Sequence, residues 1–274
     1  MNAVAVHELT VRAGSATLLH DVTLTIEPGT WCTIIGPNGA GKTTLVESIA
    51  GLRALAHGFV ALSGTRIETM GERERARAVA LVPQHPEIPT GMSVREYVTL
   101  GRTAHHGLFR AAGERDYAIV DSVLERLTLV DFAQRDVVTL SGGERQRMVL
   151  GRAMAQSTMV MVLDEPITGL DMRHQMEILE LLKQEVAECG ITVVATLHDL
   201  SLAGQFADRL VLLNHGEVVL DGTAAEVIRS DELRACYGMN LRVVEVEGAD
   251  VVVPVRGPRA STRGAGLHDG AEST

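Results

Sequence analysis

The nine residues GPNGAGKTT, from Gly36 to Thr44, decide the architecture of this chain. They follow the apolar run TWCTII and lead into TLVESIAGL, which begins at Thr44 and whose apolar residues recur at helical spacing up to Gly51. Glycines let the backbone wrap around a phosphate, and the amides of the loop and of the helix start supply partial positive charge. The order of strand, glycine loop and helix therefore predicts a nucleotide-binding α/β fold, against the alternative of a tight turn without a ligand.

The side chains of this loop add chemistry to its backbone. Lys42 contributes a full positive charge for phosphates, and the hydroxyl of Thr43 is placed to ligate magnesium. The predicted nucleotide-binding residues of the loop are Gly36, Pro37, Asn38, Gly39, Ala40, Gly41, Lys42, Thr43 and Thr44.

A second part of a nucleoside triphosphatase site is predicted in MVMVLDE, from Met159 to Glu165. An apolar strand that ends in two acids places carboxylates at the sheet edge beside the phosphate loop. We expect Asp164 to hold magnesium through water and Glu165 to act as the general base for the attacking water. On its own, such an ending is often only a polar strand end; the glycine loop gives it its functional interpretation.

Further along the chain, apolar strands alternate with helical patterns, which predicts a parallel sheet covered by helices. ITVVATLH and DRLVLLN are two more strands of this kind. We expect a core at about residues 1–85 and 158–240, with a small antiparallel β-layer in the first forty residues and a helical insert at about 86–157. A C-terminal hairpin is predicted at about 241–255, turning at Gly248 to Asp250. Residues 257–274 are Gly-, Ser- and charge-rich, and we expect them to be disordered.

Composition excludes several classes of protein. The 274 residues are 46% hydrophobic with a formal net charge of -10, which gives no general field for nucleic acid or anionic lipid. No run approaches the roughly 20 apolar residues of a membrane span, and the first residues lack the pattern of a signal peptide, so we expect a cytosolic protein. The three cysteines form no CxxC pair, which disfavours a disulfide framework or a zinc cluster.

A second glycine turn, in TLSGGERQR at residues 139–147, opens a helix inside the predicted helical insert. It offers helix-start amides but no lysine. We therefore expect it to complete a phosphate site formed mainly by other residues, and not to form such a site by itself. At this point the chain resembles, over about residues 3–255, the ATP-binding subunits of ATP-binding cassette (ABC) transporters, because LSGGERQR is similar to their signature motif. The resemblance implies a P-loop (RecA-like) core, ATP and Mg²⁺ as cofactors, and an ATP-sandwich dimer with a second copy. Ser141, Gly142 and Gly143 would then bind the ATP held by the partner.

Three more residues match elements of that family. Gln84 in LVPQ resembles the glutamine that senses magnesium and the attacking water. Asp171 in TGLD resembles the acid that crosses the dimer seam, and His198 in TLHD the switch histidine that contacts the γ-phosphate. The resemblance thus implies Glu165, His198 and Gln84 as catalytic residues, and Thr43, Gln84 and Asp164 as the magnesium site. Taken singly, these three residues could also be a strand-end polar residue, a helix N-cap and a partly buried histidine.

Two positions depart from the family pattern. The family usually stacks an aromatic residue on adenine at the position between Arg12 and Gly14, and here that residue is Ala13. We therefore expect weak discrimination between bases, unless a residue such as His20 or Leu18 covers the base. The second departure, Thr168-Gly169 before the seam leucine, is mild.

The cargo is indicated by shorter stretches. VREYVTLGR, LDMRHQ and CYGMNLRVVEV resemble the branch that imports iron chelates, haem and cobalamin, although GRTAHHG departs from it. Importers of zinc or manganese are the alternative. The resemblance implies integral-membrane permease subunits as partners, with contact near HPEIPTGMSVREY, and indirectly a substrate-binding protein. The subunit would lie peripherally on the cytoplasmic face of the membrane.

Two other functions are possible for a chain with these motifs: an ATPase that acts on DNA or ribosomes, and a regulator that binds ATP without hydrolysing it. Cassette ATPases of DNA repair and ribosomes carry long coiled-coil insertions or two cassettes, whereas Ser141 lies only 57 positions after Gln84 here, and no nucleic-acid partner is expected. An ATP-binding regulator without turnover is disfavoured because the residues for turnover are all present, namely Lys42, Asp164, Glu165 and His198.

Overall fold

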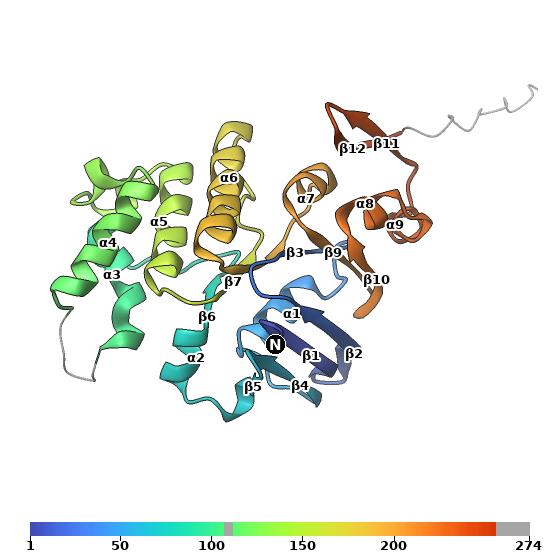
Figure 1. Cartoon of the computed structure of the whole chain (residues 1–274), viewed down its shortest axis with the longest axis horizontal. Coiled ribbons are helices and arrows are strands. Elements are labelled where there is room, and N and C mark those ends of the chain that lie inside the picture. Colours follow the sequence, from blue (N-terminus) through green and yellow to red (C-terminus); the bar gives the residue numbers. More distant parts are fainter. Residues whose placement is uncertain (107–111, 256–274) are drawn as a thin grey trace, which may run out of the picture.

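The computed structural model describes residues 1–106 and 112–255 (Figure 1). Its centre is a six-stranded sheet in which every neighbouring pair is parallel except β9 and β10. In spatial order the strands are β10 (Glu217–Thr223), β9 (Arg209–Asn214), β3 (Trp31–Ile35), β8 (Thr192–Thr196), β7 (Val160–Asp164) and β6 (Val79–Val82). The α/β prediction is confirmed, and the predicted disordered tail, residues 257–274, lies outside the described residues.

The three central strands, β3, β7 and β8, are buried at every residue. Both faces of a parallel sheet are covered, so its strands are continuous apolar runs without alternation. Alternate residues of β3 nevertheless serve two different cores. Trp31 and Ile35 face one hydrophobic cluster, whereas Cys32 and Ile34 face the other. The strand that leads into the phosphate loop is therefore anchored from both sides.

The predicted antiparallel β-layer is present as a four-stranded sheet of order β2-β1-β4-β5. Its strands are β1 (Val4–Ala13), β2 (Ala16–Ile26), β4 (His57–Leu62) and β5 (Thr65–Arg66). The runs ATLLH and VTLTI form one strand, β2, which passes through the positive φ of Asp21 without ending. Half of the strands thus come from residues 57–66, outside the first forty residues.

Helices cover both faces of the central sheet, and α3, α4 and α5 stand together at one side of the molecule (Figure 1). The α-helices are α1 (Lys42–Ile49), α2 (Glu72–Ala78), α3 (Val94–Thr99), α4 (Glu114–Arg126), α5 (Gly142–Ala155), α6 (Met172–Cys189), α7 (Leu200–Phe206), α8 (Ala224–Arg229) and α9 (Asp231–Tyr237). Between residues 86 and 157, the regular structure in the described part is helical, apart from one isolated bridge. No helix of the described residues is long and apolar enough to cross a membrane.

The C-terminal hairpin consists of β11 (Leu241–Val246) and β12 (Ala249–Pro254). The prediction placed its turn at Gly248 to Asp250, but the turn residues are Glu247 and Gly248, with φ of 52° and 83°. Two consecutive positive φ angles make the tight turn that matches the twist of the strands. Asp250 instead lies in β12, where its carboxylate accepts hydrogen bonds of 2.7 and 2.8 Å from Arg229 of α8.

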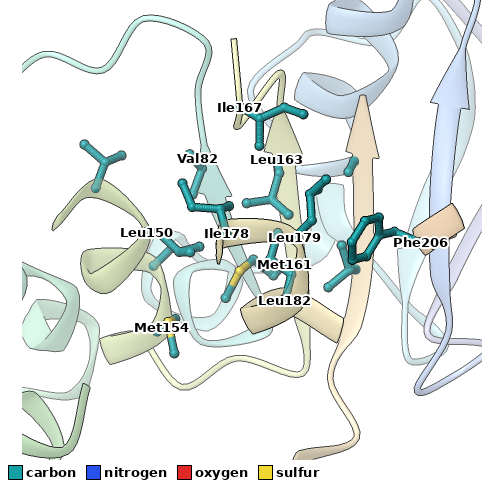
Figure 2. Packing of buried hydrophobic residues seen from close by; sticks show 14 of the residues in the cluster. Val82, Leu150, Met154, Met161, Leu163, Ile167, Ile178, Leu179, Leu182 and Phe206 are labelled. Carbon is teal, nitrogen blue, oxygen red and sulfur yellow. The ribbon is translucent and has the colours of Figure 1, made fainter. Parts of the chain in front are cut away.

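The larger hydrophobic core lies between the central sheet and the helices α5, α6 and α7 (Figure 2). In Figure 2, Met161 and Leu163 of β7 point toward the apolar face of α6. That face is formed by Ile178, Leu179 and Leu182, all at most 2% exposed. Because β7 ends in the two acids of the predicted site, this packing also sets their position.

Replacing Leu179 with alanine tests this packing. The side chain is fully buried, so the lost transfer free energy and the cavity left behind should lower the free energy of unfolding by about 2–5 kcal/mol. Urea unfolding followed by circular dichroism measures the change. Met172 of the same helix is 79% exposed, so Met172→Ala should stay within about 0.5 kcal/mol of the wild type. Equal losses for the two variants would contradict the assignment of the buried face.

Candidate functional site

The phosphate loop has a backbone that only glycine adopts easily. Gly36, Gly39 and Gly41 have φ angles of 151°, 79° and 102°. At Gly36 a Cβ atom would stand 2.0 Å from the carbonyl oxygen of Leu213, the penultimate residue of β9. A side chain there is therefore sterically impossible without moving the strand. At Gly41 a Cβ would meet the Leu18 oxygen at 2.9 Å.

Lys42 closes the loop from inside. Its Nζ donates hydrogen bonds to the carbonyl oxygens of Gly36 at 2.8 Å and Pro37 at 3.1 Å, and the residue is 7% exposed. Burial lowers the pKa of the ammonium group, and the nearby carboxylates of Glu165 and Asp164 act in the opposite direction. The positive charge is thus held at the start of α1. Phosphate oxygens can replace the two carbonyl oxygens there as hydrogen-bond acceptors of the Lys42 ammonium group.

The loop borders a cavity of about 420 Å³. Its lining residues are Thr17, Leu18, Asn38, Gly39, Ala40, Gly41, Lys42, Thr43, Thr44, Glu165, His198 and His215. The cavity therefore joins the predicted loop to two predicted catalytic residues that are more than a hundred residues away in sequence. Of the predicted loop residues, Gly36 and Pro37 do not line the cavity. Their carbonyl oxygens accept the hydrogen bonds from Lys42 instead.

Asp164 is 3% exposed at the end of β7. Its Oδ1 accepts a 2.7 Å hydrogen bond from the hydroxyl of Thr196, its direct partner in the register of β7 and β8. The Thr196 oxygen in turn accepts the backbone amide of Glu165 at 2.8 Å. The sequence analysis did not single out Thr196. Its position at the end of the neighbouring parallel strand was the signal that could have identified it.

Glu165 is the meeting point of the predicted catalytic residues. Its Oε2 accepts hydrogen bonds from Gln84 Nε2 at 2.7 Å and from the Thr168 hydroxyl at 3.0 Å, and its Oε1 contacts His198 Nε2. The side chain is 9% exposed. Glu165 also has a positive φ of 51°, a conformation that costs non-glycine residues about 1–3 kcal/mol and is concentrated at functional sites.

The second glycine turn stands outside this cavity. Ser141 caps α5 in a capping box: its amide donates to Glu144 Oε2 at 2.8 Å, and its hydroxyl accepts the Glu144 amide. The hydrogen bond from the Ser141 amide to the carboxylate is the main cause of a lowered Glu144 pKa. Ser141 and Gly142 are exposed, whereas Gly143 is buried, and a Cβ at Gly143 would meet the His174 ring at 2.8 Å.

Asp171 caps α6. Its Oδ1 accepts the His174 amide at 3.0 Å, and its Oδ2 lies 2.8 Å from His174 Nδ1. The backbone bond from His174 is the main cause of a lowered Asp171 pKa. The N-cap interpretation of this residue is therefore correct, and its predicted role at a dimer seam stays a prediction. Neither Asp171 nor the glycine turn lines the cavity among the described residues.

Ala13 ends β1, opposite Ala16, and does not line the cavity. Of the two residues considered as substitutes for the missing aromatic ring, Leu18 lines the cavity. His20 does not, and its Nδ1 lies 3.1 Å from Glu217 Oε1 at the surface. His215 lines the cavity as well, and sequence reasoning had not identified it.

Tyr237, the last residue of α9, supports the phosphate loop from the far end of the chain. The buried amide of Gly36 donates a 3.1 Å hydrogen bond to its hydroxyl oxygen. Burial raises the pKa of Tyr237 to about 12, so this hydroxyl stays neutral at physiological pH. The contact joins residues 201 positions apart.

Tyr237→Phe removes this acceptor and keeps the ring. A buried amide without a partner costs about 1–3 kcal/mol, and we expect this loss in the free energy of unfolding. Urea unfolding measures it, with Tyr117→Phe as the control because Tyr117 is 45% exposed. If both variants match the wild type, the Gly36 contact contributes nothing to stability.

A family model described as ABC transporter matches residues 19–168. The chain is 36% identical over 244 residues to the iron(3+)-hydroxamate import ATP-binding protein FhuC of Bacillus subtilis, which covers 89% of this chain and 91% of that protein. It is also 36% identical over 257 residues to the ferric enterobactin transport ATP-binding protein FepC of Escherichia coli, covering 93% and 95%.

Solved structures show the same fold. The chain superposes with a TM-score of 0.82 on a metal-chelate type ABC transporter in an inward-facing conformation, at 25% identity and over 93% of this chain and 98% of that one. A dimeric bacterial ABC transporter cassette, MJ0796, gives a TM-score of 0.73 at 27% identity, covering 81% and 98%.

Proposed function

Because the chain belongs to the ABC transporter family, we propose that it is the subunit that hydrolyses ATP to energise the import of an iron chelate, haem or cobalamin. The cargo class is supported by relatives named for iron(3+)-hydroxamate, ferric enterobactin and cobalamin, which match 89–95% of the chain. A zinc or manganese importer is the alternative from sequence. The binding of cargo would belong to a separate permease and a substrate-binding protein.

The main support for ATP hydrolysis by this chain is that Gln84 and His198 both contact the Glu165 carboxylate beside the phosphate loop. A nearly buried carboxylate at the cavity wall can accept the proton of an attacking water. Gln84 holds one carboxylate oxygen and His198 the other, so both side chains set the orientation of the base. Lys42 supplies the charge that binds the phosphates.

The residues present fit a magnesium ion. Thr43 offers a hydroxyl at the cavity wall and Asp164 a buried carboxylate one residue before Glu165. Gln84 adds an amide oxygen, since its nitrogen already donates to Glu165. Oxygen donors of this kind are the ligands that Mg²⁺ takes in nucleotide sites. Bound there with ATP, the ion would neutralise phosphate charge.

The exposed turn of Ser141 and Gly142 supports a dimer. It opens the 14-residue helix α5 and presents helix-start amides, which are suited to a phosphate, outside the chain's own cavity. Two copies placed head to tail would bring each turn, with Gly143 and Asp171, to the ATP of the other. A dimeric solved relative supports this arrangement.

Contact with the permease is proposed near residues 85–97. A groove there is lined by residues of α3, of α4 and of the segments next to α3, among them Met92 before α3, Leu100 after it and Tyr117 of α4. Tyr117 is 45% exposed, which suits a surface that a partner covers. The subunit would thus bind peripherally, on the cytoplasmic face of the membrane.

The decisive experiment is reconstitution of the chain with its permease and binding protein in liposomes. ATPase activity should rise with the permease and the chelate-loaded binding protein, together with chelate uptake. Stimulation by zinc or manganese instead would select the alternative importer. Stimulation by DNA or ribosomes without the permease would overturn the transport function.

Glu165→Gln tests the general base. The amide keeps the size of the side chain but cannot accept the proton, so the turnover number should fall at least about a hundredfold. ATP should still bind, and size-exclusion chromatography should show an accumulated ATP-bound dimer. Near-wild-type turnover in a phosphate-release assay would exclude Glu165 from this role.

A mixing experiment tests the shared site. In heterodimers of Lys42→Ala with Ser141→Arg chains, one composite site is intact and the other carries both changes. ATPase activity should therefore exceed that of either variant alone. Thr223→Arg removes a comparable cap from α8, away from the site, and should stay active. Mixtures that remain inactive, although heterodimers form, would contradict independent composite sites.

A further inference from the structure

The cavity extends beyond the phosphate loop, away from Glu165 and His198, to a part that has no predicted ligand contact for His215. There Thr17 and Leu18 of β2 meet His215, which lies in the turn between β9 and β10. We propose that the His215 imidazole packs against the nucleobase and so takes the place of the ring that Ala13 lacks. This inference rests on the proposed function, because it requires that the cavity binds ATP.

The turn that carries His215 is fixed to the phosphate loop. His215 and Gly216 have φ angles of 48° and 81°. The Gly216 amide donates a 2.9 Å hydrogen bond to the carbonyl oxygen of Ala40, inside the loop. The Gly216 oxygen accepts the His20 amide of β2, also at 2.9 Å. The backbone under the imidazole is therefore held on both sides, and its position relative to the phosphates is defined.

The packing of this turn leaves no room on the β2 side. A Cβ at Gly216 would stand 2.6 Å from the carbonyl oxygen of Leu18. The preceding side chain, His215, is exposed and lines the cavity. The ring and the partly buried Leu18 are therefore presented together, as an aromatic and an aliphatic surface for a flat base.

Among the described lining residues, the two with aromatic rings are His198 and His215. His198 is engaged with Glu165 at the catalytic end. His20, the nearest other imidazole on β2, contacts Glu217 outside the cavity. His215 is thus the ring that a base can contact while Lys42 and the loop amides hold the phosphates.

The test compares a ligand with a base to one without. Dissociation constants of Mg-ATP and of inorganic triphosphate are measured by calorimetry for the wild type, His215→Ala, His215→Phe and His20→Ala. Loss of one base stack weakens binding by about five- to 150-fold. His215→Ala should lose ATP affinity by this factor and keep its triphosphate affinity within about twofold. His215→Phe and the control His20→Ala should bind ATP like the wild type.

Three results would overturn the inference. They are unchanged ATP affinity in His215→Ala, an equal loss for triphosphate, and an equal loss in His20→Ala. If His215→Ala does not fold, His215→Leu replaces it, and the inference requires weaker ATP binding for Leu than for Phe. A wild type that binds neither ligand would overturn the proposed function itself, which separates the two failures.

Discussion

The rest of the structure depends on one close approach, that of the Gly36 backbone to the carbonyl group of Leu213. It allows the chain to leave β3, cross the end of β9 and turn into α1 within a few residues. The same crossing places the Gly36 carbonyl within 2.8 Å of Lys42 Nζ and the turn at Gly216 against Ala40. The shape of the nucleotide site is therefore set by the packing of main-chain segments. The side chain of Lys42 then supplies its charge.

The central sheet also fixes the position of Glu165, the proposed general base. The register between β7 and β8 puts Thr196 opposite Asp164, and its single hydroxyl contacts both the Asp164 carboxylate and the Glu165 amide. The backbone at Glu165 then adopts a positive φ and aims the side chain at Gln84 and His198. The cost of that conformation is offset by contacts from three different segments.

The sequence was sufficient for features whose signal is local. The glycine spacing around Lys42 and the apolar runs before Gly36 and Glu165 predicted the core of the fold. Other features depend on long-range packing. Tyr237 and His215 carry no pattern of their own, and their roles arise because α9 and the turn after β9 are brought to the phosphate loop. The hairpin turn was misplaced because a positive φ at Glu247 cannot be read from composition.

The hydrogen bond between Gly36 and Tyr237 joins segments that are synthesised at very different times. The phosphate loop leaves the ribosome 201 residues before the hydroxyl that completes its hydrogen bonds. At about 5–20 residues per second, the Gly36 amide waits roughly 10–40 s for its partner. A nascent chain that already contains Lys42 and the rest of the glycine loop is therefore still without one support of that loop. The loop therefore gains this support only after Tyr237 has been synthesised and α9 has packed against Gly36.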